Sequence, residues 1–177
     1  MCLVIGAPGV GKTLLLKRLH GEQHSGNNYT HLDEAPVTIP TVGTNLMNVV
    51  FNRRSEVTVR ELGGCMAPIW DKYYEGCPAV IFMIDVSNRC QIAASCIQLL
   101  DALTNATLSN VNFLIILNKI DVADRMSRQE INFFFRLEEV IENTSQKIKV
   151  IEVSAREGQG LLEVAQWIQE HTKPTVS

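Results

Sequence analysis

Eight residues near the start of the chain have the types and the spacing of a phosphate-binding loop. They fit the pattern G-x-x-x-x-G-K-[ST], and the run reads Gly6-Ala7-Pro8-Gly9-Val10-Gly11-Lys12-Thr13. A short apolar run, Cys2 to Ile5, precedes the loop, and a helical pattern from Leu14 to Leu19 follows it. Glycines let successive backbone N–H groups turn toward a phosphate, and the N-terminus of the next helix adds partial positive charge. The sequence therefore predicts a nucleoside-phosphate site between a strand and a helix.

Two side chains of this loop carry the rest of the expected phosphate chemistry. The ammonium group of Lys12 can reach the β- and γ-phosphate oxygens, and the hydroxyl of Thr13 can ligate Mg²⁺. The alternative is a glycine-rich turn without a ligand, which the strand and the helix on either side of the loop disfavour. The residues that we expect to contact the phosphates are Gly6, Gly9, Val10, Gly11, Lys12 and Thr13.

A second group of polar residues predicts which base is bound. Asn118-Lys119-Ile120-Asp121 directly follows an apolar run, and Ser154-Ala155-Arg156 follows the next one. The carboxylate of Asp121 can accept hydrogen bonds from guanine N1–H and the exocyclic amine together, whereas adenine offers no such donor pair. We expect Asn118 to tie its loop to the phosphate loop, the Lys119 stem to cover the base, and a backbone N–H of residues 154–156 to meet guanine O6. Because asparagine and aspartate are common in turns, the prediction of guanine rests on both segments together with the phosphate loop.

Apolar runs alternate with helical patterns along the chain. Further strands are predicted at Val57–Leu62, Ala79–Asp85, Phe113–Leu117 and Ile148–Val153. Helices are predicted at Ile92–Leu103, Glu130–Thr144 and Gly160–His171. This alternation predicts an α/β fold with a mostly parallel central sheet and helices on both faces. Such sheets bind ligands at the carboxyl ends of their strands, where both groups of polar residues are placed.

Composition and net charge predict the number of domains, the cellular compartment and the absence of a nucleic-acid partner. The chain has 177 residues and 46% hydrophobic content, which suits one domain, residues 1–177, around a buried sheet. A net charge of −3 indicates no nucleic-acid partner. The five cysteines form no C-x-x-C pair, and their odd number indicates a reducing, cytoplasmic setting. The polar segment Gly21–Pro36 predicts a mobile loop.

The sequence predicts no intrinsic membrane anchor. No apolar run approaches the length of a transmembrane helix, and no signal peptide precedes the phosphate loop. Cys2 stands where N-myristoylation needs glycine, and residues 173–177 lack a prenylation cysteine. We therefore expect any membrane association to come through a partner or a modification.

With both groups of residues present in order, the chain resembles the Arf-like branch of the small GTPases. Ile39–Asn45 is similar to the first switch of that family, and Glu61–Cys65, followed by Pro68-Ile69-Trp70, is similar to the second. The resemblance extends from Leu3 to about Ile168. It implies the P-loop small-GTPase fold and a molecular switch that binds GTP or GDP with Mg²⁺. Protein effectors and regulators would contact the two switch regions.

The resemblance also implies roles for particular residues and a cellular setting. Thr41 would complete the magnesium coordination when GTP is bound, and the Gly64 amide would sense the γ-phosphate. The implied metal ligands are Thr13, Thr41 and Glu61. We expect a monomer in the cytoplasm. The association of the family with membrane traffic and cilia implies that partners recruit the protein to membranes or to the cilium.

Three departures from the family pattern affect the expected activity. Glu61 stands where the family carries an aspartate that holds a magnesium-bound water, and the extra methylene must shift or replace that water. Cys65 stands where the family carries the glutamine that positions the attacking water, and a thiol is too weak a hydrogen-bonding group to do so. We therefore expect very slow intrinsic hydrolysis. The first strand begins almost at Met1, where the family has an amphipathic helix, so nucleotide exchange is not expected to drive membrane insertion in the family's way.

Two other functions compete with a switch. A pseudo-GTPase interaction module that holds GTP as a structural cofactor is favoured by Cys65 and Glu61, whereas Thr41 and the Gly63-Gly64 pair favour a switch that senses the γ-phosphate. A P-loop nucleoside kinase would need an acceptor-binding domain and a lid with arginines, and no segment of the chain supplies them.

Some residues keep two interpretations each. Cys65 is either an inert replacement or a redox-sensitive thiol. Trp70 and the Tyr73-Tyr74 pair are expected either to pack in the core or to contact effectors.

Overall fold

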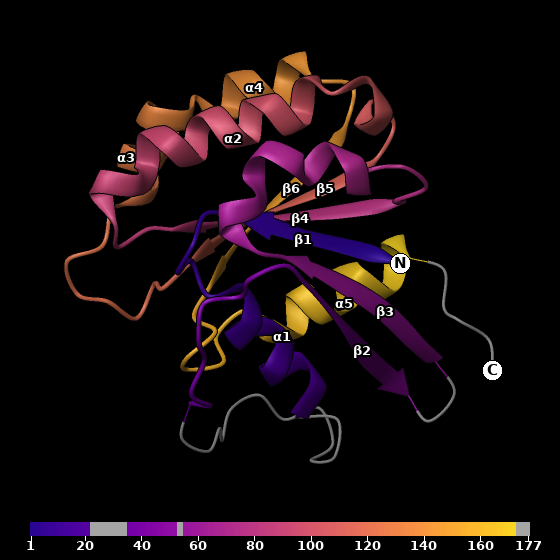
Figure 1. The fold of residues 1–177 in the computed structure, drawn as a ribbon. Helices are drawn as coiled ribbons and strands as arrows, with labels where there is room; N and C mark the ends of the chain where they lie inside the picture. The colour runs from indigo at the N-terminus through magenta and orange to yellow at the C-terminus, as the bar shows by residue number, and fades with distance from the viewer. Residues whose placement is uncertain (22–34, 53–54, 173–177) are drawn as a thin grey trace.

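The computed structural model describes residues 1–21, 35–52 and 55–172, and within these residues six strands form one central sheet (Figure 1). The strands are β1 (Cys2–Gly6), β2 (Thr44–Asn52), β3 (Ser55–Leu62), β4 (Ala79–Asp85), β5 (Asn112–Asn118) and β6 (Lys147–Val153). Their order is β2-β3-β1-β4-β5-β6, and every neighbouring pair is parallel except β2 and β3. The predicted α/β fold with a mostly parallel sheet is confirmed.

Helices cover both faces of the sheet (Figure 1). One face packs against α1 (Lys12–Gly21) and α5 (Leu161–His171). The other face packs against α2 (Ile92–Thr104), α3 (Arg128–Phe135), α4 (Leu137–Asn143) and the 3₁₀ helices η2 (Gly64–Tyr73) and η4 (Ala106–Leu108). A third 3₁₀ helix, η3 (Arg89–Gln91), precedes α2 and has no buried residue. The side chains of β4 are buried on both faces, as its continuous apolar run predicts.

Two elements differ from the sequence-based expectation. The helix predicted at residues 130–144 is broken into α3 and α4, because Arg136 adopts a left-handed backbone conformation with φ 47°. Strand β2 was not predicted, since asparagines interrupt its apolar pattern. Among the described strands it is at the edge of the sheet, where it pairs with β3. Residues 22–34 of the predicted mobile loop lie outside the described residues, and Gly21 is the last residue of α1.

The carboxyl ends of the parallel strands meet at one edge of the sheet. There β1 leads into the phosphate-binding loop, β3 into Gly63, β4 ends at Asp85, β5 at Asn118, and β6 leads into Ser154. The edge therefore gathers residues that lie far apart in the sequence. Among the described residues, no helix has the length and apolar character needed to cross a lipid bilayer.

Candidate functional site

The residues expected to bind the metal, and the expected phosphate contacts except Gly6 and Val10, line one pocket at this edge of the sheet. The pocket has a volume of about 180 Å³. Its lining comes from the loop after β1, from residues 38–41, and from Glu61, Gly64 and Cys65 at and after the end of β3. The fold thus brings both segments that resemble switches against the phosphate-binding loop.

The ammonium group of Lys12 is held inside the loop by backbone carbonyls. Its Nζ donates to the carbonyl oxygens of Gly6 at 2.7 Å and Ala7 at 2.9 Å, and the residue is buried. Burial lowers the pKa of Lys12 to about 8, although the nearby Glu61 and Cys65 act in the opposite direction. A buried cation that is held by neutral carbonyls is suited to an anionic ligand in the pocket.

Three side-chain oxygens from three different segments converge beside Lys12. The hydroxyls of Thr13 and Thr41 lie 2.9 Å apart, and both donate to Glu61 Oε1, at 2.5 and 3.1 Å. The other carboxylate oxygen, Glu61 Oε2, is buried and has no hydrogen-bond partner among the described residues. Hydroxyl and carboxylate oxygens are the ligands that a hard divalent cation such as Mg²⁺ prefers, so these residues fit that ion.

The chain after β3 lies directly against the phosphate-binding loop. A Cβ on Gly64 would lie 2.2 Å from the backbone nitrogen of Pro8, so no other residue fits there without moving the loop. The Gly63 N–H donates to the Gly43 carbonyl at 2.9 Å, and Trp70 Nε1 donates to the Gly63 carbonyl at 3.2 Å. These bonds connect the segment around Thr41 with helix η2. Cys65 is exposed and lines the same pocket.

Asn118 joins the base-side residues to the phosphate-binding loop. Its Nδ2 donates to the Val10 carbonyl at 2.8 Å, and its Oδ1 accepts from the Ala155 N–H at 3.1 Å. The side chain is buried, so both hydrogen bonds lie away from solvent. This is the contact that the sequence predicted for Asn118, extended to a third loop.

The other base-side residues are also brought together. Ser154 Oγ donates to Asp121 Oδ1 at 2.7 Å, and the Arg156 carbonyl accepts from Arg18 Nη2 at 3.1 Å. The Nζ of Lys119, whose stem is expected to cover the base, forms an ion pair with Asp85 Oδ2 at 2.6 Å. That pair holds Lys119 along the edge of the site.

Two residues with structural roles at the site were not identified from the sequence. Asp85 pairs with Lys119, and its position as the last residue of a predicted strand was a signal that could have revealed it. Gln91 donates from Nε2 to the Pro8 carbonyl at 3.0 Å. Nothing local in the sequence marks Gln91, since its partner lies 83 residues away.

Comparison with known proteins decides the family. The family model described as the ADP-ribosylation factor family matches residues 1–172. The chain belongs to this family. It is 48% identical to human ADP-ribosylation factor-like protein 16 over 96% of this chain and 84% of that relative. It is 30% identical to ADP-ribosylation factor-like protein 1 of Drosophila melanogaster over 94% of this chain and 85% of the relative.

A solved structure confirms the fold of this family member. The Arl6 BBS3 small GTPase from Trypanosoma brucei, solved with the bound nucleotide analogue GppNp, superposes with a TM-score of 0.77. The sequences are 22% identical, and the match covers 96% of this chain and 95% of that chain. The chain therefore has the small-GTPase fold.

Asn118→Ala tests the joint between the three loops. The substitution leaves the Val10 carbonyl and the Ala155 N–H buried without partners, so we expect the free energy of unfolding to fall by about 2–4 kcal/mol. Urea denaturation of the nucleotide-free protein measures this loss. Asn110→Ala, at an exposed position, is the matched control and should change little. Equal losses in the two variants would show that the loops do not depend on Asn118.

Proposed function

We propose that the protein is a molecular switch that binds GTP or GDP with Mg²⁺ and recruits effectors through its two switch regions, residues 39–45 and 61–74. The observation that carries this proposal is the convergence of the Thr13, Thr41 and Glu61 oxygens in the phosphate pocket. Thr41 comes from a segment outside the strands and helices, and it meets two residues held by α1 and β3. Membership of the ADP-ribosylation factor family supports a guanine nucleotide as the ligand.

The phosphate end of the nucleotide would be bound by the loop after β1. Its backbone N–H groups and the N-terminus of α1 favour anionic oxygens, and Lys12 would exchange its contacts with carbonyls for contacts with phosphate. Thr13, Thr41 and Glu61 would hold the magnesium ion, which neutralises charge on the β- and γ-phosphates. Because Oε1 of Glu61 reaches both hydroxyls, the glutamate is proposed to ligate directly.

The base would be bound by the residues that follow β5 and β6. In this proposal Asp121 accepts from guanine N1–H and the exocyclic amine, and one backbone N–H of residues 154–156 faces guanine O6. The N–H groups of Ser154 and Ala155 donate to the Gln159 carbonyl and to Asn118 Oδ1, so the Arg156 N–H is the one proposed for this contact. The hydrogen bond from Ser154 supports this role, because it orients the Asp121 carboxylate. Asn118 keeps the base-side and phosphate-side loops at a constant separation.

The γ-phosphate would select between two arrangements of the switch segments. Both Gly64 and Thr41 line the pocket; with GTP, the Gly64 N–H would contact the γ-phosphate and the Thr41 hydroxyl would complete the magnesium coordination. With GDP, both contacts would be lost, and the bond from Gly63 to Gly43 would transmit the loss from one segment to the other. The surface built by both segments then depends on the nucleotide.

Hydrolysis by the protein alone is proposed to be very slow. Cys65 lies in the pocket at the position expected to orient water, and a thiol cannot donate and accept as a carboxamide does. Acceleration would come from another protein. We place this single-domain protein in the cytoplasm as a monomer that partners recruit to membranes or to the cilium.

A pseudo-GTPase that holds GTP as a structural cofactor is the second candidate. The same cysteine favours it, since a protein that never hydrolyses GTP needs no water-positioning residue. The nucleotide that co-purifies and its rate of exchange discriminate between the two functions. Bound GTP that does not exchange favours the module, whereas exchangeable GDP and GTP favour the switch.

Asp121→Asn tests the selection of guanine. The amide can no longer accept from both guanine donors, so we expect GTP affinity to fall by about tenfold or more and preference to shift toward xanthosine triphosphate. Competition against a fluorescent GTP analogue measures both effects. Asp124→Asn, an exposed residue nearby in the same loop, should bind GTP normally. The hypothesis fails if ATP competes as well as GTP in the unmodified protein.

Cys65 variants test the expected loss of water positioning. The purified protein should hydrolyse GTP at about 10⁻⁴ per second or below, and Cys65→Leu should change this little because there is little assistance to lose. Single-turnover phosphate release measures the rate. Cys65→Gln should raise it, provided that Glu61 permits a normal magnesium site. A large loss in Cys65→Leu would show instead that the thiol takes part in hydrolysis.

A further inference from the structure

The two faces of the β2–β3 hairpin have different environments. Val49, Val57 and Val59 point into the core that also contains α1 and α5. On the opposite face, Leu46 of β2 and Arg60 of β3 are directly paired across the strands. Leu46 is 55% exposed, and Tyr73 at the end of helix η2 contacts this face beside Arg60. A leucine and an arginine thus lie side by side on an accessible part of the sheet.

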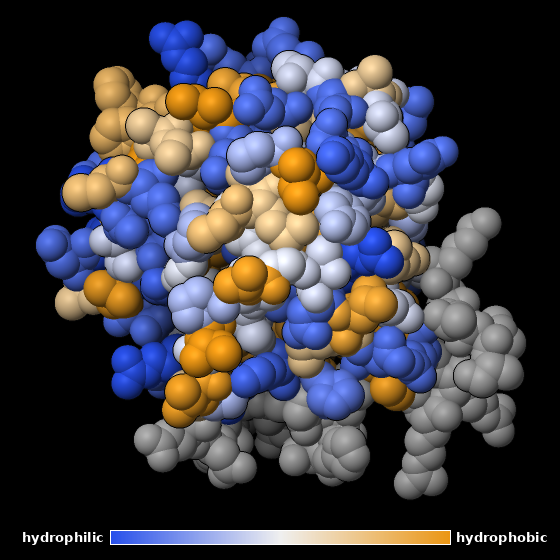
Figure 2. Space-filling view, in the orientation of Figure 1, coloured by the Kyte–Doolittle hydropathy of each residue, from blue (hydrophilic) through white to orange (hydrophobic). Residues whose placement is uncertain are grey.

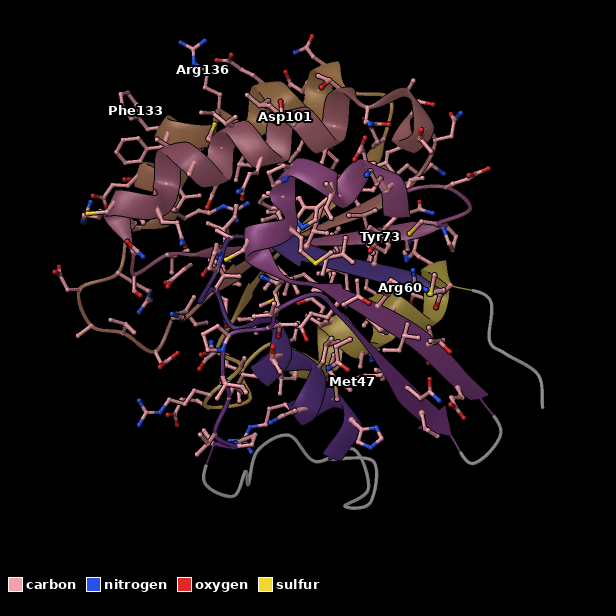
Figure 3. All side chains as sticks on the ribbon, in the orientation of Figure 1. Met47, Arg60, Tyr73, Asp101, Phe133 and Arg136 are labelled. Carbon is pink, nitrogen blue, oxygen red and sulfur yellow. The ribbon has the colours of Figure 1, made fainter. Side chains whose placement is uncertain are left out.

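Arg60 carries a charge that nothing in the described residues neutralises. No hydrogen bond or ion pair is made by its guanidinium within that part of the chain, and its Nε is buried without a partner. The guanidinium carbon lies 5.6 Å from the centre of the Tyr73 ring. Figure 3 shows the two side chains close together, one from β3 and one from the end of η2. Stacking fixes the cation while its terminal N–H groups stay available to a ligand.

Apolar side chains lie near this cation. Leu46 is paired with Arg60 across the strands, and Ile69, which is 37% exposed, precedes Tyr73 by four residues in η2. Figure 2 shows hydrophobic residues interspersed with polar ones over η2 and the hairpin. Arginine and tyrosine are enriched in protein–protein binding hot spots, and the side chains around such residues help to exclude water. We call Leu46, Arg60, Ile69 and Tyr73 the Arg60 patch.

We propose that the Arg60 patch binds a protein partner that inserts a carboxylate side chain, flanked by apolar residues, against the Arg60 guanidinium. Charge complementarity carries the choice of partner, because a fixed guanidinium without an internal counter-ion is best matched by a carboxylate from outside. A lipid surface is a poorer match. Anionic membranes are bound by clusters of several basic residues, whereas here the exposed acids Asp71 and Glu75 lie close in sequence to Tyr73.

The patch is coupled to the nucleotide pocket, and this step rests on the proposed function. Arg60 directly precedes Glu61 on β3, and Tyr73 is the last residue of the helix that begins at Gly64. Trp70, in that helix, donates to the Gly63 carbonyl. A change in the segment 63–65 on loss of the γ-phosphate would therefore shift Tyr73 against Arg60, so the acidic partner binds the GTP form more tightly.

Selection of displayed random peptides tests the proposal. The full chain is loaded with a non-hydrolysable GTP analogue, and the enriched peptides should carry aspartate or glutamate beside apolar residues. Arg60→Glu should weaken their binding by about tenfold or more, and exchanging the acidic residue of the peptide for lysine should restore it. Arg60→Gln, which removes the charge without reversing it, should give an intermediate loss. Affinity for the GTP analogue verifies that each variant is folded.

Matched controls separate the patch from general electrostatics. Lys147→Glu reverses an exposed charge on β6, at the opposite edge of the sheet from the hairpin, and should have little effect. Tyr73→Phe keeps the ring under the guanidinium and should retain binding, whereas Tyr73→Ala should lose it. A selection without acidic enrichment or without binders, or an equal loss in Lys147→Glu, overturns the proposal.

Two further measurements decide whether the anion belongs to a protein or a lipid, and whether binding at the Arg60 patch depends on the bound nucleotide. In the first, the protein is mixed with phosphatidylserine vesicles. If it binds them and Arg60→Glu abolishes that binding, the carboxylate or phosphate comes from a lipid, and the proposal of a protein partner is overturned. In the second, acidic peptides are tested against the GDP-loaded and the analogue-loaded protein. Equal binding would support the docking site but refute its dependence on the nucleotide. The two failures are therefore distinguishable.

Discussion

The contact of Glu61 with the hydroxyls of Thr13 and Thr41 is the interaction on which the proposed nucleotide pocket depends. It joins the first helix, the segment before β2 and the end of β3 through one carboxylate oxygen. A buried carboxylate needs compensation, and two hydroxyl donors leave its second oxygen unpaired. A divalent cation would neutralise the unpaired oxygen. The binding of nucleotide, the binding of metal and the position of the segment that carries Thr41 therefore depend on one another.

Strand geometry then gives neighbouring residues of β3 different tasks. Because successive side chains of a strand point to opposite faces, Glu61 faces the pocket while Arg60 faces the exposed side of the hairpin. The segment that follows, Gly63-Gly64, abuts the phosphate-binding loop and begins the helix that ends beneath Arg60. One short stretch of chain thus lies between the nucleotide and the surface offered to a partner.

Much of this architecture could be predicted, and the failures have physical causes. The apolar runs at 79–85 and 113–117 are strands because both of their faces are buried, and the spacing from Gly6 to Thr13 forms the expected loop. Strand β2 was missed because an edge strand needs no continuous apolar run. The break between α3 and α4 depends on the left-handed backbone conformation of Arg136. The pairing of Lys119 with Asp85 depends on a contact between the ends of two strands. Those are tertiary effects that no local pattern contains.

If the γ-phosphate orders the switch segments, as we propose, hydrogen–deuterium exchange should show it directly. Backbone amides of residues 41–43 and 63–65 would be compared between the GDP-bound protein and the protein bound to a non-hydrolysable GTP analogue. We expect exchange that is slower by about tenfold or more with the analogue in both segments, and unchanged exchange in β4 and β5. Equal exchange in both nucleotide states would contradict it, and would leave GTP as a static structural ligand.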